Sequence, residues 1–191
     1  MSVEAIESVD TWLLELVDRH RHPALDSFAH FVMYIGHTVP GVTVCVLLGL
    51  TIVIALRLWR PGIAVVVAFF VSGLIADVLK NVVDRPRPPA SLAIVPTNGM
   101  SMPSSVAAAS SAAAIALLMT YRWDSARARR RFTLALVAAL VVVGACMVYL
   151  GAHWASDVVA GWVLGAGVGA AVGLGCRDRT KDSLRNGVPT A

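Results

Sequence analysis

The chain is organised around a polar connector of 23 residues, VVDRPRPPASLAIVPTNGMSMPS, which spans residues 82–104. It carries the proline-separated basic residues Arg85 and Arg87 near its start and ends at Ser104. Apolar segments precede and follow it, so it is a polar stretch inside an otherwise apolar part of the chain. We expect it to lie outside a membrane and to link two membrane-spanning helices.

The composition indicates an integral membrane protein. Of the 191 residues, 57% are hydrophobic and only 15% are charged, and the mean hydropathy is +0.72. Soluble domains carry about a quarter charged residues. The three cysteines have no CxxC spacing and indicate neither a disulfide framework nor a zinc site. We therefore expect an all-α fold, a polytopic bundle of membrane helices.

Five apolar segments have roughly the 17 to 25 residues that a membrane span requires. They are residues 40–56, 61–79, 105–121, 132–150 and 158–175. A shorter apolar segment, 24–36, is either a partial span or, as we favour, a helix that leads into the first span. The sequence thus predicts five or six transmembrane helices. The last segment is rich in glycine, which is typical of close helix packing.

The two ends of the chain differ from this bundle, which we place at residues 24–175. Residues 1–23 alternate apolar and acidic residues at roughly helical spacing, which predicts an amphipathic helix at the membrane interface. The acidic start also argues against a cleavable signal peptide. Residues 176–191 form a basic tail, which we expect to be cytoplasmic and without regular structure. The histidines between His20 and His37 match no familiar metal-ligand spacing, so no metal site is predicted.

The lysines and arginines predict the orientation. With five spans, eleven basic residues fall on one face: Arg57, Arg60, Arg122, Arg127, Arg129, Arg130, Arg131, Arg177, Arg179, Lys181 and Arg185. The positive-inside rule makes that face cytoplasmic. The excess of basic residues on the cytoplasmic face explains the net charge of +4, so no nucleic-acid partner is expected. Lys80, Arg85 and Arg87 lie on the opposite face, against the rule's trend, and indicate an anionic ligand.

The residues of this opposite, extracytoplasmic face suit a phosphate. Lys80 supplies a point charge, and Arg87 supplies a planar fork beside a proline-rich turn. Ser104 and Ser105 stand where the next span begins. A helix start with free N–H groups and hydroxyls is itself an anion site.

A second short polar connector carries His153 and Asp157, four residues apart and therefore on one face of a helical turn. The carboxylate can hold one imidazole nitrogen and leave the other basic, as a nucleophile requires. Each feature also has a structural explanation: headgroup anchors for the basic residues, a helix cap for the serines, and a joint between spans for the His–Asp pair. Their common position on one predicted face favours a phosphate site.

Three motifs resemble those of the type 2 phosphatidic acid phosphatase superfamily. The stretch KNVVDRPRP, from Lys80 to Pro88, matches the family's Lys-x6-Arg-Pro signature. The stretch YLGAHWASDVVAG, from Tyr149 to Gly161, resembles the third motif, and PSS at 103–105 resembles the first half of the second, Pro-Ser-Gly-His. The resemblance covers about residues 61–175.

The resemblance implies a phosphatase that uses neither metal nor cofactor. In the family, the counterpart of His153 attacks the phosphate to give a phosphohistidine, and the counterpart of Asp157 orients it. The counterparts of Lys80 and Arg87 clamp the phosphoryl oxygens.

Two positions depart from the family pattern. The second-motif histidine, which protonates the leaving oxygen, falls at Val106, and a phosphate-clamping arginine of the third motif falls at Met147. A general acid is commonly worth about 10²–10⁴ in rate, and a charged clamp a comparable factor. The acid matters least when the leaving group is itself a phosphate.

We therefore expect a metal-independent lipid phosphatase in the inner cell membrane. Its active site would face away from the cytoplasm and remove a phosphate from a lipid phosphate or diphosphate that arrives from the bilayer. The alternative is an impaired family member that binds or moves a lipid phosphate or acts as an assembly partner. A third hypothesis is that Val106 was introduced to disable the enzyme.

Overall fold

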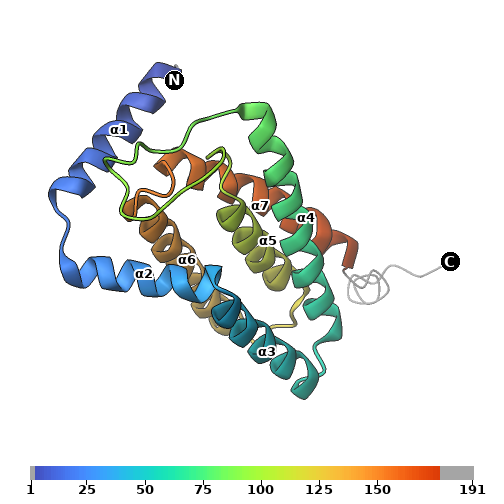
Figure 1. The fold of residues 1–191 in the computed structure, drawn as a ribbon. Helices are drawn as coiled ribbons and strands as arrows, with labels where there is room; N and C mark the ends of the chain where they lie inside the picture. Colours follow the sequence, from blue (N-terminus) through green and yellow to red (C-terminus); the bar gives the residue numbers. More distant parts are fainter. Residues whose placement is uncertain (1–2, 177–191) are drawn as a thin grey trace.

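The computed structural model describes residues 3–176 (Figure 1). In this range, helices are joined by short connectors and one long connector. The seven helices of this range are α1 (Val3–Arg19), α2 (Pro23–His37), α3 (Val39–Ala55), α4 (Trp59–Val83), α5 (Ser105–Thr120), α6 (Ala126–Tyr149) and α7 (Ala155–Cys176). The all-α prediction is confirmed. The tail expected at 176–191 lies outside the described residues, apart from the last residue of α7.

Three helices are long and apolar enough to cross a membrane, namely α4, α6 and α7, with 25, 24 and 22 residues. Helices α2 and α3 pass together as one further candidate span, bent by 61°. The apolar helix α5 has 16 residues, or about 24 Å against a hydrocarbon core of about 30 Å. By length and apolar composition, the described residues therefore contain three candidate spans, or four if the bent pair α2–α3 counts as one span. The count of five or six spans stays a prediction, because α3 and α5 are short.

The ends of two helices differ from the predicted spans. Helix α4 continues to Val83, so Lys80 lies in its last turn and the polar connector covers residues 84–104. Asp84 ends the helix in the left-handed conformation, with φ of 52°, and its N–H bonds the Lys80 carbonyl at 2.9 Å. Helix α6 begins at Ala126, so the arginines that follow lie in its first turns and not in a loop.

Helices α5 and α7 pack with their backbones in close contact. Gly161, Gly165 and Gly169 lie one helical turn apart along the α7 surface that faces α5. A Cβ atom at Gly165 would lie 2.1 Å from the carbonyl oxygen of Ala108, which no side chain permits. The close packing predicted for this glycine-rich segment is confirmed.

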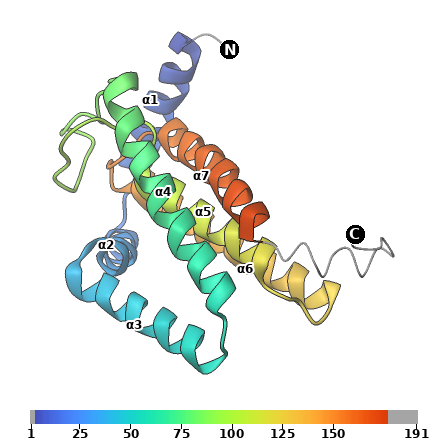
Figure 2. The ribbon, with the colours of Figure 1, turned by 90° about the vertical axis from the view of Figure 1, so that its right-hand side faces the viewer.

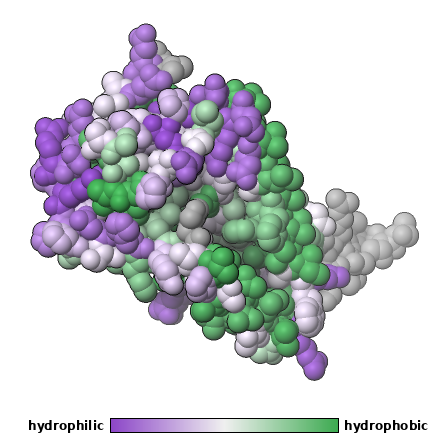
Figure 3. Space-filling view, in the orientation of Figure 1, coloured by the Kyte–Doolittle hydropathy of each residue, from purple (hydrophilic) through white to green (hydrophobic). Residues whose placement is uncertain are grey.

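The other helices surround this pair unequally. Helix α4 buries its small side chains against the bundle, at Ala64, Ala68, Ser72 and Ala76. Helix α3 is buried only at Gly41, so most of its apolar surface is exposed. Figures 1 and 2 show α1 and the long connector at the same end of the bundle. Hydrophilic residues gather at that end, while hydrophobic residues cover α3 and α4 (Figure 3).

The glycines of α7 provide a test of the packing. We expect Gly165→Ala to lower the thermal unfolding midpoint of the detergent-solubilised protein, because its Cβ would lie 2.1 Å from the Ala108 carbonyl. Forcing extra volume into a packed interface costs about 1–3 kcal/mol.

The matched control is Gly167→Ala, where no atom lies within 4 Å of the added Cβ. This change should leave stability unaltered or raise it by up to about 1 kcal/mol, because alanine favours a helix over glycine. Equal midpoints for the two variants would contradict the packing described for α5 and α7.

Candidate active site

The long connector, residues 84–104, folds onto the short connector between α6 and α7. Trp154 donates its indole N–H to the Pro86 carbonyl at 3.0 Å. Arg87 Nη1 donates to the Ala152 carbonyl at 2.6 Å. These contacts bring the basic start of the long connector against the residues that precede α7.

His153 is buried, with 6% of its surface exposed, and its Nε2 lies 3.3 Å from Arg87 Nη1. A guanidinium has only donors, so Nε2 must be the accepting nitrogen. The proton of a neutral imidazole then sits on Nδ1, which lies 3.5 Å from Asp157 Oδ2. This distance exceeds that of a normal hydrogen bond. Such contacts are often long in free enzymes and tighten when substrate binds.

Burial lowers the pKa of His153 below its ordinary value, and the charges of Arg87 and Lys80 lower it further. The hydrogen bond and charge of Asp157 act in the opposite direction. Burial also lowers the pKa of Arg87, although its guanidinium stays charged. A neutral imidazole near pH 7 leaves Nε2 unprotonated, and only an unprotonated nitrogen can attack phosphorus.

Asp157 is fully buried at the start of α7, and both of its carboxylate oxygens are bound. Oδ2 accepts from the Trp154 backbone N–H at 2.9 Å, and Oδ1 accepts from Arg85 Nη1 at 2.8 Å. The second amino group of Arg85 binds Asp10 Oδ2 of α1 at 2.7 Å. Arg85 therefore bridges two buried carboxylates.

Lys80 lies beside the start of α5. Its Nζ is 2.5 Å from Ser105 Oγ and 3.1 Å from Asp77 Oδ1. Ser105 also donates to Asp77 Oδ1 at 2.6 Å. The three side chains form a polar group, of which the sequence analysis did not single out Asp77. Its position three residues before Lys80 on one helix is the sequence feature that indicates the pair.

Ser104 serves the helix packing. Its N–H donates to the Asp157 carbonyl at 3.0 Å, and its hydroxyl accepts from the Ala107 N–H at 3.4 Å as the cap of α5. The same hydroxyl contacts the sulfur of Met147 at 3.6 Å. Ser104 thus joins α5 to α7, and its side chain is engaged within the bundle.

Val106 and Met147 lie in one apolar cluster. Met147 is buried with Ala107 and Val158, and Val106 and Met33 pack against them. Only 1% of the Met147 surface is exposed. The two positions at which the sequence predicts a departure from the family motifs, 41 residues apart, therefore belong to one apolar cluster, here called the apolar wall.

The structure thus brings His153, Asp157 and Arg87 into contact, and places Lys80 with Ser105 at the start of α5. Neither Asp10 nor the pairing of Arg85 was predicted from the sequence. No local pattern indicates either, because Asp10 and Arg85 are 75 residues apart. Within residues 3–176, no three His, Cys, Asp or Glu side chains gather as metal ligands would.

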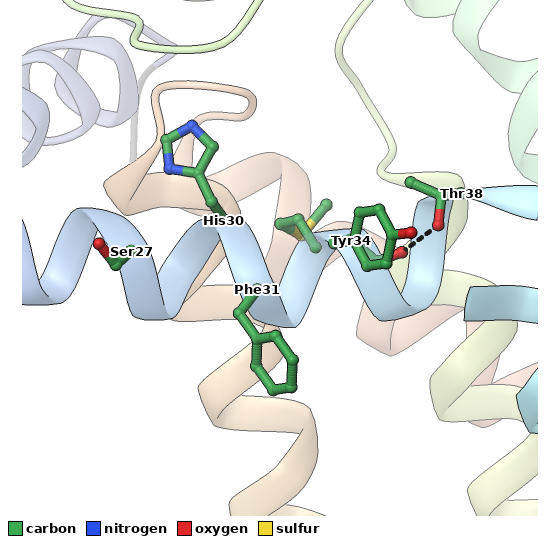
Figure 4. A pocket seen from close by; sticks show the side chains of 6 residues that line it. Ser27, His30, Phe31, Tyr34 and Thr38 are labelled. Atoms are coloured by element: carbon green, nitrogen blue, oxygen red, sulfur yellow. Dashed lines mark hydrogen bonds between the residues drawn. The ribbon is translucent and has the colours of Figure 1, made fainter. Parts of the chain in front are cut away.

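A surface hollow of about 510 Å³ lies along α2, and none of the residues predicted to bind phosphate lines it. Its lining is mostly apolar and comprises Ser27, His30, Phe31, Met33, Tyr34 and Thr38 (Figure 4). Figure 4 also shows Thr38 bonded to the Tyr34 carbonyl, at 2.8 Å, where α2 ends. Met33 belongs to both the hollow and the apolar wall, so it connects the two.

Comparison with known proteins gives one family. The sequence profile of the PAP2 superfamily matches residues 61–180. The chain is 29% identical over 160 residues to an undecaprenyl-diphosphatase of Sulfolobus acidocaldarius, across 81% of this chain and 72% of that protein.

Two crystal structures share the fold. The first is a transmembrane PAP2-type phosphatidylglycerolphosphate phosphatase from Bacillus subtilis, with a TM-score of 0.75 and 21% identity over 90% of this chain and 85% of that one. The second is Aquifex aeolicus LpxE, with a TM-score of 0.66 and 22% identity over 85% of this chain and 93% of that one.

The burial of His153 predicts its titration. In the ¹⁵N spectrum of histidine-labelled protein in detergent, we expect the His153 imidazole to be mostly neutral at about pH 6.5, the ordinary pKa of histidine. The His153→Asn variant identifies the signal. Asp157→Asn should lower the pKa further, because the carboxylate stabilises the imidazolium. A His153 pKa above 6.5 in the unmodified protein would contradict the conclusion that burial has the largest effect on this pKa.

Proposed function

Because the chain belongs to the PAP2 superfamily, the type 2 phosphatidic acid phosphatases whose motifs it resembles, we propose that it is a membrane phosphatase acting on a lipid phosphate or diphosphate. One observation carries the proposal: His153 is buried, its Nε2 contacts Arg87, and its Nδ1 lies beside Asp157. A protein that only bound phosphate would have no need of an oriented, uncharged imidazole.

In the proposed reaction, Nε2 of His153 attacks phosphorus. A P–N bond forms while the P–O bond to the leaving group breaks, and the imidazole becomes a phosphorylated cation. Asp157, close to Nδ1, stabilises this positive charge. Water then adds to phosphorus and breaks the P–N bond, which releases phosphate and restores the histidine. Lys80 and Arg87 hold the phosphoryl oxygens.

The apolar wall favours a diphosphate substrate. Val106 and Met147 have no proton to give, so an alkoxide leaving group would depart unprotonated. When a lipid diphosphate loses its terminal phosphoryl group, the leaving group is a phosphate, which needs little protonation. The relative from Sulfolobus acidocaldarius is named a diphosphatase, which agrees with this preference. The hydroxyl of Ser105, next to Val106 and bound by Lys80, is the polar group available there.

We place the active site on the extracytoplasmic side of a five-span bundle, with α1 at the membrane interface. The connector 84–104 lies at one end of the bundle. The α3–α4 turn and the start of α6, which carry basic residues, lie at the other end. The positive-inside rule assigns that second end to the cytoplasm. The apolar hollow on α2, joined to the wall by Met33, suits the chain of a lipid.

The apolar wall also favours a second candidate function. A family member without the acid and without one clamp could bind or move a lipid phosphate and never cleave it. Val106 and Met147 support this alternative, whereas the buried pairing of His153 with Asp157 supports catalysis.

Purified protein in detergent should release phosphate from a polyprenyl diphosphate faster than from phosphatidate or phosphatidylglycerophosphate. His153→Ala should abolish this release, because no other nucleophile replaces the imidazole. The measurement is inorganic phosphate set free in the presence of a metal chelator. Absence of release from all three lipids would support the binding alternative, and full activity of His153→Ala would exclude the assigned nucleophile.

Restoring the acid should widen the substrate range. We expect Val106→His to raise release from phosphatidate by about 10²-fold or more, the usual worth of a general acid. Release from the diphosphate should change far less. Val106→Asn is the matched control, since it adds a polar group of similar reach that transfers no proton at neutral pH. Equal gains for the two variants would show that polarity, and not proton transfer, limits the reaction.

A further inference from the structure

We propose that Asp10, on the N-terminal helix α1, is a positioning residue of the active site, which acts on Asp157 through Arg85 and through the first turn of α7. The inference rests on the proposed function and adds a residue to it. Asp10 precedes the residues matched by the family profile, 61–180.

Asp10 is among the most buried polar residues of the described chain, with 3% of its surface exposed. Its Oδ2 binds Arg85 Nη2 at 2.7 Å. Its Oδ1 accepts from the Ser156 backbone N–H at 3.0 Å, and the Ser156 hydroxyl also donates to the carboxylate. The carboxylate therefore holds a free N–H group of the first turn of α7, next to Asp157.

Arg85 carries the effect of Asp10 to the catalytic carboxylate. Its Nη1 donates to Asp157 Oδ1 at 2.8 Å and to Ser156 Oγ at 2.5 Å. Its guanidinium also lies over the Trp154 ring, 5.4 Å from the centroid. With Oδ1 held in this way, Asp157 can present only Oδ2 to His153. Loss of Asp10 would free one end of the guanidinium and leave it to pair with Asp157 alone.

Attachment of α1 does not by itself explain a buried carboxylate. Val9 and Trp12 on the same helix are 55% and 57% exposed, and Leu14 already packs inside with 1% exposed. A buried ion pair stabilises a fold no better than well-packed apolar groups of similar size. The position of Asp10 against Arg85 and the start of α7 favours a role in the site.

The charge arithmetic supports this role. Asp10 and Asp157 carry two negative charges and Arg85 one positive charge, so the trio has a net negative formal charge, and its member Asp157 lies beside His153. The other charged groups that act on the imidazole, Arg87 and Lys80, are positive. The trio thus stabilises the imidazolium-like state that forms when His153 is phosphorylated.

Asp10→Asn tests the proposal because it keeps the shape of the side chain and removes its charge. We expect kcat for the lipid diphosphate to fall by about 10–100-fold, while KM changes less than about twofold. A loss of this size is usual when a residue that orients a metal-binding side chain is replaced, and Asp10 would orient Asp157 in the same way. The His153 pKa, followed by ¹⁵N NMR, should fall with the loss of a negative charge. Arg85→Gln should move it in the opposite direction. Glu7→Gln, an exposed charge on the same helix, is the matched control and should change neither quantity.

Two comparisons make the result decisive. Asp10→Asn added to Arg85→Gln should lower kcat by clearly less than the product of the two single effects, because Asp10 acts in part through the arginine. If Asp10→Asn does not elute as a folded species from size exclusion in detergent, Arg85→Lys replaces it as the test. This variant keeps the charge but not the fork, and it should lower kcat by about 10–100-fold.

An unchanged His153 pKa and kcat in folded Asp10→Asn protein would overturn the proposal, as would wild-type kcat in Arg85→Lys. The NMR titration needs no turnover, so it tests Asp10 even in a protein that releases no phosphate. Failure of the proposed function and failure of this inference are therefore distinguishable.

Discussion

The rest of the site depends on the contact between the backbones of α5 and α7. Glycines on α7 lie against the Ala108 and Ala112 carbonyl oxygens of α5, so the two helices cannot slide or rotate without collision. Close contact of this kind gains dispersion energy and needs no hydrophobic driving force, which suits a membrane interior. It places the start of α5 against the first turn of α7, where Ser104 bonds the Asp157 carbonyl.

The site built at that junction has two chemically different sides. One side is polar and carries Arg87, His153 and the Lys80 group. The other side is the apolar wall around Met147. In the proposed reaction, the polar side binds the phosphoryl group, and the apolar wall has no proton to give to a basic leaving group. The proposed preference for a diphosphate rests on this division.

The short-range parts of this arrangement could be predicted from the sequence. The spacing between His153 and Asp157, and between Lys80 and Arg87, is set by a few residues of helix or turn, so the motifs carry it. The partners of Arg85 could not be predicted. Its two carboxylates, Asp10 and Asp157, are 75 and 72 residues away, and no periodicity describes pairs that only the tertiary fold creates.

Helix α1 shows the same limit. Its acidic residues alternate with apolar ones and predict an amphipathic helix, but the face that a helix buries is decided by its neighbours. Trp12, part of the expected apolar stripe, is 57% exposed, whereas Leu14 and Asp10 are buried. Helices α4 and α6 also extend beyond the apolar segments 61–79 and 132–150 that predict the spans, because polar residues continue both helices. Helix α6 takes in arginines that hydropathy assigned to a loop.

The ion pairs around the site have one more consequence. Three basic side chains are balanced there by three acidic ones: Lys80, Arg85 and Arg87 against Asp77, Asp10 and Asp157. With a neutral imidazole, these groups have no net formal charge and attract anions in water only weakly at long range. Free phosphate therefore gains little by returning from solution. A lipid phosphate confined to the bilayer reaches the same site by diffusion in two dimensions, so the membrane itself separates substrate from product.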